Sequence, residues 1–382
     1  KDTYQTSDLL RKETEERASV ACIGMAGERG ALVAGIVNDG WDGRFAARGG
    51  LGAVMGSKNL KAIVLRGTRK PQVADAAALK ESTQPVIRYL TEIKRNMGPK
   101  RLRMLGGIMR DLQDTGNLPV RNWSRGRFES FVKMVETSLV HTKLYFCYSC
   151  PVGCAESTIG PKGREIVGEA IMPMGSNCLI DDLEALEEAY RLCNRYGMDS
   201  ISVGACVAFG MEAFEKGLIT REDTDGVELT WGNAQALVDM VKQMGEAKSF
   251  GKLLGQGVKR AAAQIGGDAA QFAMHVKGLE APLHDPRAYP SLLLSYATAN
   301  RGCCHLESHS YAIDRKKMNL GNVAVRANAQ ELGWPPEKVV RLSFEGKADI
   351  AAKTQDLEAM NNSLCICNFS YFTYGVQAHN YV

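Results

Sequence analysis

Cys147-Tyr-Ser-Cys150-Pro-Val-Gly-Cys154 places three thiols within eight residues, on a segment interrupted by a proline and a glycine. Thiolates at these spacings can converge on one soft metal centre without straining the backbone. Three ligands leave one corner of a cubane cluster open, and Cys365 and Cys367 offer two distant candidates for that corner. The pattern favours a [4Fe–4S] cluster held by a short loop and one remote cysteine.

A zinc site and a chance cluster of thiols are the alternatives to an iron–sulfur cluster in this stretch. A structural zinc site would more often bring a second C-x-x-C pair or a histidine at metal-finger spacing. A chance cluster of buried thiols is conceivable because free cysteine is among the most buried residue types. The chain has 11 cysteines, an odd number that does not indicate a disulfide framework. It indicates a reducing compartment with some thiols committed to metal.

Bulk composition describes an ordinary globular protein. The 382 residues allow two or three domains, and 45% are hydrophobic and 24% charged. A net charge of +4 with scattered basic residues predicts neither nucleic acid nor a membrane surface as partner. We see no apolar run of membrane-helix length and no signal peptide, so we expect a cytoplasmic protein. The chain begins without methionine and ends without a capping signal, as if entered and left in mid-domain.

The hydrophobic periodicity predicts a mostly α protein with a small β-containing N-terminal remnant. The expected strands are Ser19–Gly24, Ala31–Val37 and Ala62–Leu65. The expected helices are residues 9–16, 76–103, 183–193, 201–216, 234–244 and 250–265. Asp181-Asp182 is expected to cap the 183–193 helix, and Gly197 to end it in a left-handed conformation.

Arg44-Phe-Ala-Ala-Arg48-Gly-Gly-Leu-Gly-Ala53 is a glycine-rich segment that carries two arginines. Such a segment can hold a phosphate with backbone N–H groups and guanidinium donors. A lone glycine-rich loop is more often a tight turn, so both interpretations stay open.

Two further residues are candidates for acid–base chemistry. Glu169 lies in an apolar segment punctuated by proline and glycine, where desolvation would raise its pKa toward that of a general base. The alternative is an exposed loop glutamate. His305 follows Arg301-Gly-Cys-Cys304, a turn of small residues that can place an imidazole at a cavity wall. A lone histidine is more often structural.

Asn194-Arg-Tyr-Gly-Met-Asp199 and Asn362-Ser-Leu-Cys-Ile-Cys367 share one form: an asparagine, two variable residues, a small residue, an apolar residue and then aspartate or cysteine. Paired helix-ending turns of this kind can bind two similar halves of one polycyclic ligand.

Residues 23–28, 48–63 and 194–202, together with the C-x-x-C-x-x-x-C loop, resemble the aldehyde:ferredoxin oxidoreductase family. The resemblance runs from about residue 18 to about 370 and lacks most of the family's N-terminal β-rich domain and its C-terminal end. It implies three parts: 1–72, the end of the β-rich pterin-covering domain 1; 73–275, α-helical domain 2 with the cluster loop; and 276–382, the start of α-helical domain 3.

The resemblance implies a [4Fe–4S] cluster, a tungsten or molybdenum bis-pterin, and a Mg²⁺ bridging the pterin phosphates. The implied cluster ligands are Cys147, Cys150, Cys154 and Cys367. The implied pterin-binding residues are Arg44, Phe45, Asn194, Met198, Asp199, Asn362 and Ile366, and the implied catalytic residues are Glu169 and His305.

Three departures from the family pattern stand out. Asn194 and Asn362 replace aspartates, so an amide that donates and accepts stands where the family has an acceptor only. Cys365 stands where glycine is usual. Glu188 falls near the position of an inter-subunit iron ligand, but no histidine lies where its partner is expected, which argues against a bridging iron.

The implied reaction is the oxidation of an aldehyde, with water, to a carboxylic acid, with electrons passing through the cluster to ferredoxin or another iron–sulfur carrier. In it Glu169 takes a proton from water and His305 donates toward the carbonyl oxygen. The implied assembly is a homo-oligomer or a hetero-oligomer with an electron-transfer subunit. One alternative is the tungsten subunit of a benzoyl-CoA reductase, and another is a non-enzymatic [4Fe–4S] electron-transfer module.

Overall fold

The computed structural model describes all residues except 39, 41–43, 70–71, 98–103, 139, 146–154, 164, 167, 315–332, 335–338 and 368–382. It leaves out the side chains of 86, 89–90, 93–97, 104–107, 140–145, 155–158, 165 and 168–170 as well. The chain forms two compact units, each built from three segments. The first unit is Lys1–Thr68, Leu118–Val140 and Ile159–Leu283, and the second is Arg69–Asn117, His141–Thr158 and His284–Val382. The domain boundaries expected at 72 and 275 remain a prediction.

The first unit begins with helix α1 (Thr3–Glu13), which Asp2 caps by accepting the N–H of Gln5 at 2.8 Å. An antiparallel sheet follows, in the order β3–β2–β1–β4. Its strands are β1 (Ser19–Cys22), β2 (Ile36–Asn38), β3 (Arg44–Ala46) and β4 (Ala62–Leu65). The buried side chains of Val20, Cys22 and Val37 form the core face of this sheet.

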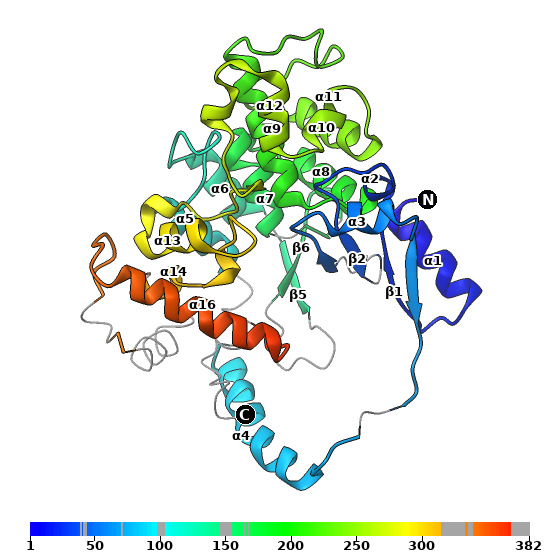
Figure 1. Cartoon of the computed structure of the whole chain (residues 1–382), viewed down its shortest axis with the longest axis vertical. Helices are drawn as coiled ribbons and strands as arrows, with labels where there is room; N and C mark the ends of the chain where they lie inside the picture. The colour runs from blue at the N-terminus through cyan, green and yellow to red at the C-terminus, as the bar shows by residue number, and fades with distance from the viewer. Residues whose placement is uncertain are drawn as a thin grey trace. The chain divides into compact units, whose positions relative to one another are not determined.

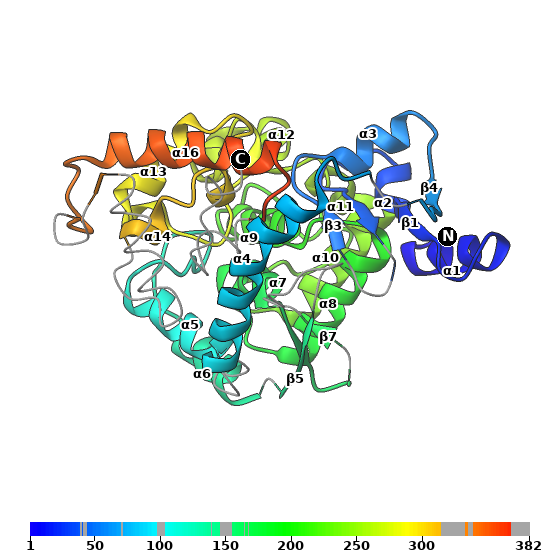
Figure 2. The same ribbon diagram turned by 90° about the horizontal axis from the view of Figure 1, so that it is seen from below.

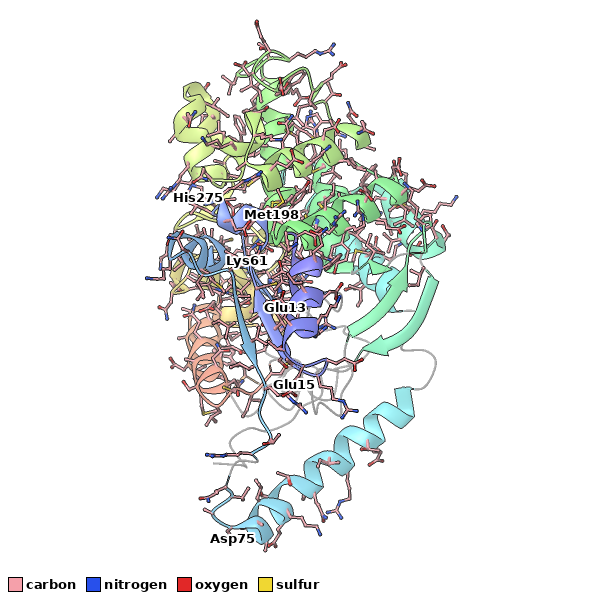
Figure 3. The ribbon with its side chains drawn as sticks, turned by 90° about the vertical axis from the view of Figure 1, so that its right-hand side faces the viewer. Glu13, Glu15, Lys61, Asp75, Met198 and His275 are labelled. Atoms are coloured by element: carbon pink, nitrogen blue, oxygen red, sulfur yellow. The ribbon has the colours of Figure 1, made fainter. Side chains whose placement is uncertain are left out.

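The expected strand over 31–37 is wrong for most of its length, since only 36–38 belongs to the sheet. The backbone before it pairs with another segment. Val33 accepts the N–H of Asp199 at 2.8 Å, and Ala34 forms an isolated bridge with Met198, which is labelled in Figure 3. These main-chain groups are therefore not available to extend the ladder.

The glycines of the 48–63 block allow close backbone packing. Short helices α2 (Met25–Glu28) and α3 (Leu51–Ser57) lie against each other, as Figure 1 shows. A Cβ on Gly56 would overlap the carbonyl of Gly27, and a Cβ on Gly52 would overlap that of Gly35. Part of this block is therefore rich in glycine because two backbones approach closely there.

The helical body of the first unit follows the predicted pattern closely. Its long helices are α8 (Leu183–Tyr196), α9 (Ser200–Glu215) and α10 (Ala234–Glu246). Asp182 caps α8 by accepting the N–H of Ala185 at 3.1 Å, and Gly197 ends it at φ 72°. The remaining elements are α6 (Glu129–Ser138), β7 (Glu165–Ile166), α7 (Gly168–Met174), η3 (Ser176–Cys178), α11 (Ser249–Leu254), α12 (Val258–Ile265), η4 (Gly267–Phe272), β8 (His275–Val276) and β9 (Leu279–Glu280).

The single helix expected over 250–265 is two helices. The break falls at Gly255-Gln-Gly257, where Gly257 adopts φ 84° and the chain leaves the helical region. Glycine takes this conformation without a steric penalty, which explains why the apolar pattern continues across the break.

The second unit is built mainly from helices α13 (Pro290–Thr298), α14 (Tyr311–Asp314) and α16 (Lys347–Ser363), which Figure 2 shows running alongside one another. Lys347 forms a buried ion pair with Asp314, whose carboxylate also accepts the hydroxyl of Ser291 at 2.6 Å. This contact joins all three helices. The other elements are α4 (Ala76–Met97), α5 (Met104–Asp114), most of β5 (Val140–Tyr145) and β6 (Ala155–Ile159), η5 (Pro286–Ala288) and η6 (His305–Glu307).

The described elements confirm a mostly α fold with a small N-terminal sheet. None of the described helices combines the length and the apolar character that a bilayer span requires.

Candidate cofactor-binding and active site

The first of the two similar segments is the turn that ends α8 in the first unit. Gly197 adopts φ 72°. Its N–H donates to the carbonyl of Asn194 at 3.2 Å, and the Met198 N–H donates to the carbonyl of Cys193 at 2.8 Å. This is a glycine-terminated helix end in which the residue after the left-handed position closes the turn. The Asn194 side chain hydrogen-bonds to Tyr4, whose pKa is raised chiefly by burial.

Asp199 leaves this turn and caps the next helix. Its carboxylate accepts the N–H groups of Ile201 and Ser202, each at 3.2 Å. A carboxylate has about four lone-pair sites, so Asp199 keeps acceptor capacity for a further donor. The Asp199 side chain is 4% exposed, so a hydrogen bond that it accepts from a further donor would be shielded from water.

Arg48 connects the glycine-rich block to Asp199. Its Nη1 lies 3.5 Å from the Asp199 carboxylate, and its Nη2 donates to the carbonyl of Glu280 at 2.5 Å. The Glu280 carboxylate accepts the N–H of Val258 at 3.1 Å, and burial raises its pKa. Arg48 is one of the two arginines of the segment expected to hold a phosphate, whereas the resemblance implied Arg44 and Phe45, on β3, as the pterin-binding residues of this block.

The second similar segment is the turn that ends α16 in the second unit, and its geometry repeats the first. Cys365 adopts φ 56°. Its N–H donates to the carbonyl of Asn362 at 3.2 Å, and the Ile366 N–H donates to the carbonyl of Asn361 at 2.8 Å. Cys365 thus occupies the position of Gly197 and Ile366 that of Met198. This position of the turn requires a left-handed conformation, which glycine adopts without a steric penalty and cysteine does not. That requirement accounts for the glycine expected here from the resemblance.

Cys367 lies one residue beyond this turn and is exposed. The three other predicted cluster ligands lie in 146–154, outside the described residues. Within the described part of the chain, no group of three or more histidine, cysteine or acidic side chains is arranged to hold a metal ion.

Most of the other described cysteines are structural. Cys22, Cys178, Cys193 and Cys206 are buried, and burial raises the pKa of each thiol, to about 11 for Cys22. A thiol with a raised pKa is a poor metal ligand and a poor nucleophile at neutral pH. The exposure of Cys367 separates it from this group.

Glu169 is in helix α7, so the alternative of a loop glutamate does not hold. Pro173 stands inside this short helix and Gly175 follows it, so the two punctuating residues mark its C-terminal end. The Glu169 side chain lies outside the described residues. Glu188, which stands near the position of the expected iron ligand, forms an ion pair with Arg191 on the same helix. Its carboxylate therefore already has a cationic partner.

His305 opens η6 in the second unit and lies in a cluster of aromatic rings. The His284 ring lies 4.8 Å from it in an edge-on arrangement, and the Tyr311 ring lies 6.1 Å from it. His309 is stacked on Tyr311 at 5.2 Å and shares a 3.3 Å contact with its hydroxyl. Burial lowers the pKa of His309 to about 4. His305 is therefore one of three clustered histidines, which the sequence did not reveal because each stands alone in the chain.

Family models and related proteins agree with these features. Residues 86–382 match the family model described as aldehyde ferredoxin oxidoreductase, domains 2 & 3, and residues 1–67 match the model of the N-terminal domain. The matched models and the mostly helical fold define the class of the chain as an oxidoreductase scaffold of this kind. The chain belongs to the aldehyde ferredoxin oxidoreductase family.

Similar proteins carry related names. The chain is 33% identical to a tungsten-containing aldehyde ferredoxin oxidoreductase of Pyrococcus furiosus, over 100% of this chain and 61% of that protein. It is 32% identical to an aliphatic sulfonate oxidoreductase, WOR-like subunit, of the same organism, over 68% of this chain and 44% of that protein. The chain therefore spans about three fifths of the length of the first of these relatives.

A solved structure shares the fold. It is the active site complex BamBC of benzoyl coenzyme A reductase in complex with 1,5-dienoyl-CoA. The TM-score is 0.78 at 22% sequence identity, over 100% of this chain and 63% of that chain.

Proposed function

We propose that the protein oxidises aldehydes to carboxylic acids with a tungsten or molybdenum bis-pterin and a [4Fe–4S] cluster. The observation that carries the proposal is the repeated turn. The two motif segments end α8 and α16 with the same pair of hydrogen bonds, at 3.2 Å and 2.8 Å in both. Two equivalent turns suit a cofactor with two equivalent halves, and Cys367 follows the second turn directly.

The residues present fit this cofactor pair. Asn194, Asp199 and Asn362 offer polar groups at the two turns, and Arg44 and Arg48 of the glycine-rich segment offer positive charge for the pterin phosphates. Four cysteines, Cys147, Cys150, Cys154 and Cys367, form the donor set of a cubane cluster. When bound, the bis-pterin metal supplies the two-electron redox chemistry and the cluster carries single electrons away.

The protein's own part in the reaction is to move protons. The overall change is RCHO + H₂O → RCOOH + 2 e⁻ + 2 H⁺, so one group must take a proton from water while the carbonyl oxygen is stabilised. We assign the first role to Glu169 and the second to His305. The rings of His284 and Tyr311 lie beside His305 and restrict its orientation, which favours a directional hydrogen bond to the substrate oxygen.

Electrons leave to ferredoxin or to another iron–sulfur carrier. The relative named a WOR-like subunit and the BamBC complex are both described as parts of assemblies. They support a protein that works as a homo-oligomer or with an electron-transfer subunit.

A second candidate is reduction of an aromatic thioester on the same scaffold, which the likeness to the BamBC structure favours. The direction of reaction separates the two. Assayed with viologen dyes, the aldehyde oxidase reduces the dye when given aliphatic or aromatic aldehydes. A thioester reductase is silent with aldehydes and consumes reduced dye when given benzoyl-CoA.

The decisive experiment is metal analysis of the full-length protein together with this aldehyde assay. We expect one tungsten or molybdenum and four irons per polypeptide, with aldehyde-dependent dye reduction. Four irons per polypeptide without tungsten or molybdenum would overturn the proposal. That result would favour a non-enzymatic electron-transfer protein that carries only the cluster.

A further inference from the structure

Asn117 and His284 make a buried contact in the second unit. The Asn117 side-chain amide is fully buried, and its Nδ2 lies 2.9 Å from Nδ1 of His284. The His284 side chain is also buried. Neither residue was expected from the sequence to belong to a site.

The orientation of the Asn117 amide is fixed by a second hydrogen bond. Its Oδ1 accepts the backbone N–H of Asp285 at 2.9 Å, a donor that the backbone carbonyl of Asn117 shares at 3.1 Å. A main-chain N–H can only donate, so the oxygen must face Asp285 and the NH₂ group must face His284.

This orientation determines the protonation of His284. The Asn117 NH₂ can only donate, so Nδ1 of His284 must accept and carries no proton. The remaining proton of the neutral ring is therefore on Nε2. Protonating the ring fully would set an N–H against the NH₂ group of Asn117, which disfavours the imidazolium.

The rings that neighbour His284 belong to uncharged side chains. His284 stacks on Tyr311 at 4.4 Å and its backbone carbonyl accepts the hydroxyl of Tyr296 at 3.1 Å. His309 is buried beside the same tyrosine, and its low pKa keeps it uncharged at neutral pH. Two ion pairs lie close by in the chain: Asp285 with Arg287, at 2.5 Å, and Arg301 with Glu307, at 3.2 Å. Glu358 of α16, which packs against η6, has a pKa raised to about 8 by burial, aided by Glu307.

We propose that Asn117 is a positioning residue of the active site, which holds His284 as the neutral Nε2–H tautomer so that His305 is the imidazole of this cluster that exchanges a proton. The role of His305 in this statement rests on the proposed function. The tautomer of His284 rests only on the contacts above.

The first test reads the tautomer directly in the full-length holoprotein labelled with ¹⁵N-histidine. Protonated and unprotonated ring nitrogens resonate in separate ranges, and a His284→Gln variant assigns the His284 signals. We expect an unprotonated Nδ1 and a protonated Nε2 at pH 7. A protonated Nδ1 in the unaltered protein would overturn the proposal, whatever the enzyme's activity.

The second test inverts the contact with Asn117→Asp. The carboxylate still accepts from Asp285 but now also accepts from His284, so the proton moves to Nδ1 or the ring becomes charged. We expect kcat to fall at least ~10-fold with a smaller change in KM, because a proton-transfer step is altered rather than binding. Asn233→Asp is the matched control, since Asn233 caps α10 through an acceptor oxygen that aspartate also provides, and it should leave kcat unchanged.

The third test keeps the proposal falsifiable if Asn117→Asp fails to fold. In His284→Gln the amide oxygen can accept from Asn117 and the NH₂ group can donate, as Nδ1 and Nε2–H do in the proposed tautomer. His284→Phe has neither an acceptor nor a donor. We expect the glutamine variant to keep kcat within about 5-fold and the phenylalanine variant to lose at least ~50-fold, in the range seen for proton-transfer groups. Equal kcat values in the two variants would show that His284 only fills space.

The failure of the proposed function remains distinguishable from the failure of this inference. A protein that oxidises no aldehyde removes the role of His305 but leaves the ¹⁵N result readable. A protein that oxidises aldehydes with His284 in the other tautomer removes the inference alone.

Discussion

Replacing Lys347 with methionine removes the cationic partner of Asp314 from the interior of the second unit. The two side chains are 1% and 0% exposed. Methionine retains much of the apolar stem, so the main change is the loss of one buried charge. Asp314 would then be an uncompensated buried carboxylate, and we expect the variant to fold with this group protonated instead.

The magnitude follows from the proton that Asp314 must take up. Protonating a carboxyl with an ordinary pKa of about 3.9 costs about 4 kcal/mol at pH 7 and about 1.5 kcal/mol at pH 5. We therefore expect the free energy of unfolding of the second unit to fall by these amounts relative to the unaltered protein. The value at pH 7 agrees with the roughly 3–5 kcal/mol lost when one partner of a buried ion pair is removed.

The sign of the pH dependence is set by burial. Burial raises the pKa of Asp314 in the folded chain, and Lys347 and Ser291 partly oppose this. A raised folded pKa means that the folded state holds the proton more tightly than the unfolded state does. Stability is therefore present at low pH and is lost as the pH rises, more steeply in the variant, which lacks Lys347.

Hydrogen exchange of the α16 backbone amides is the assay, because it reports the opening of this helix by itself. A loss of about 4 kcal/mol raises the open population about 1,000-fold at pH 7. Lys353→Met is the matched control on the same helix. Its ion pair with Asp349, at 2.9 Å, has side chains 44% and 46% exposed, and its loss should cost less than about 1 kcal/mol.

Two results would refute the reasoning. One is a Lys347→Met variant that is as mild as Lys353→Met at pH 7. The other is a loss that does not shrink when the pH is lowered to 5. The double variant with Asp314→Asn should recover most of the stability, since a neutral pair has no buried charge to compensate.

Three further predictions concern the site. Glu169→Gln should retain metals and cluster but lower turnover at least ~100-fold, the scale of a lost general base; near-normal kcat with aldehyde would remove the assignment. His305→Ala should lower kcat more than it raises KM, because a donor to the developing alkoxide acts mainly in the transition state; a change confined to KM would make His305 a binding residue. Cys367→Ser should abolish or convert the [4Fe–4S] signal in EPR, whereas Cys365→Gly should keep it and relieve a left-handed strain of roughly 1 kcal/mol. The opposite pair of EPR results would show that the register of this turn is wrong.

Local signals in the sequence determined much of the fold. The bounds of α8 followed from Asp182 and Gly197, because a helix cap and a left-handed end depend on neighbouring residues only. The second turn was recognisable from Asn362 onward for the same reason, although a cysteine stands at its left-handed position. Gly197 and Cys365 adopt the same left-handed geometry. The hydrogen bonds of the turn therefore impose this geometry even where the residue is not glycine.

The sequence also misplaced the strand expected over 31–37, where the main chain made a non-local contact. Ala34 bridges to Met198 instead of extending the sheet, and the pairing joins residues more than 160 positions apart. No local pattern carries that information. The exposed loop that was the alternative for Glu169 is replaced by a helix that begins at Gly168 and ends at Pro173 and Gly175.

Only the tertiary structure could reveal the histidine cluster. Residues 284, 305 and 309 are separate in the chain, and Asn117 lies far before all of them, so no local pattern brought them together. Folding of the second unit sets the Asn117 amide against His284 and the His284 ring against His305. The sequence by itself determined the family and the turns, which depend on short-range patterns. The protonation and pairing of buried side chains depend on which distant groups come within hydrogen-bonding distance, and only the folded chain decides that.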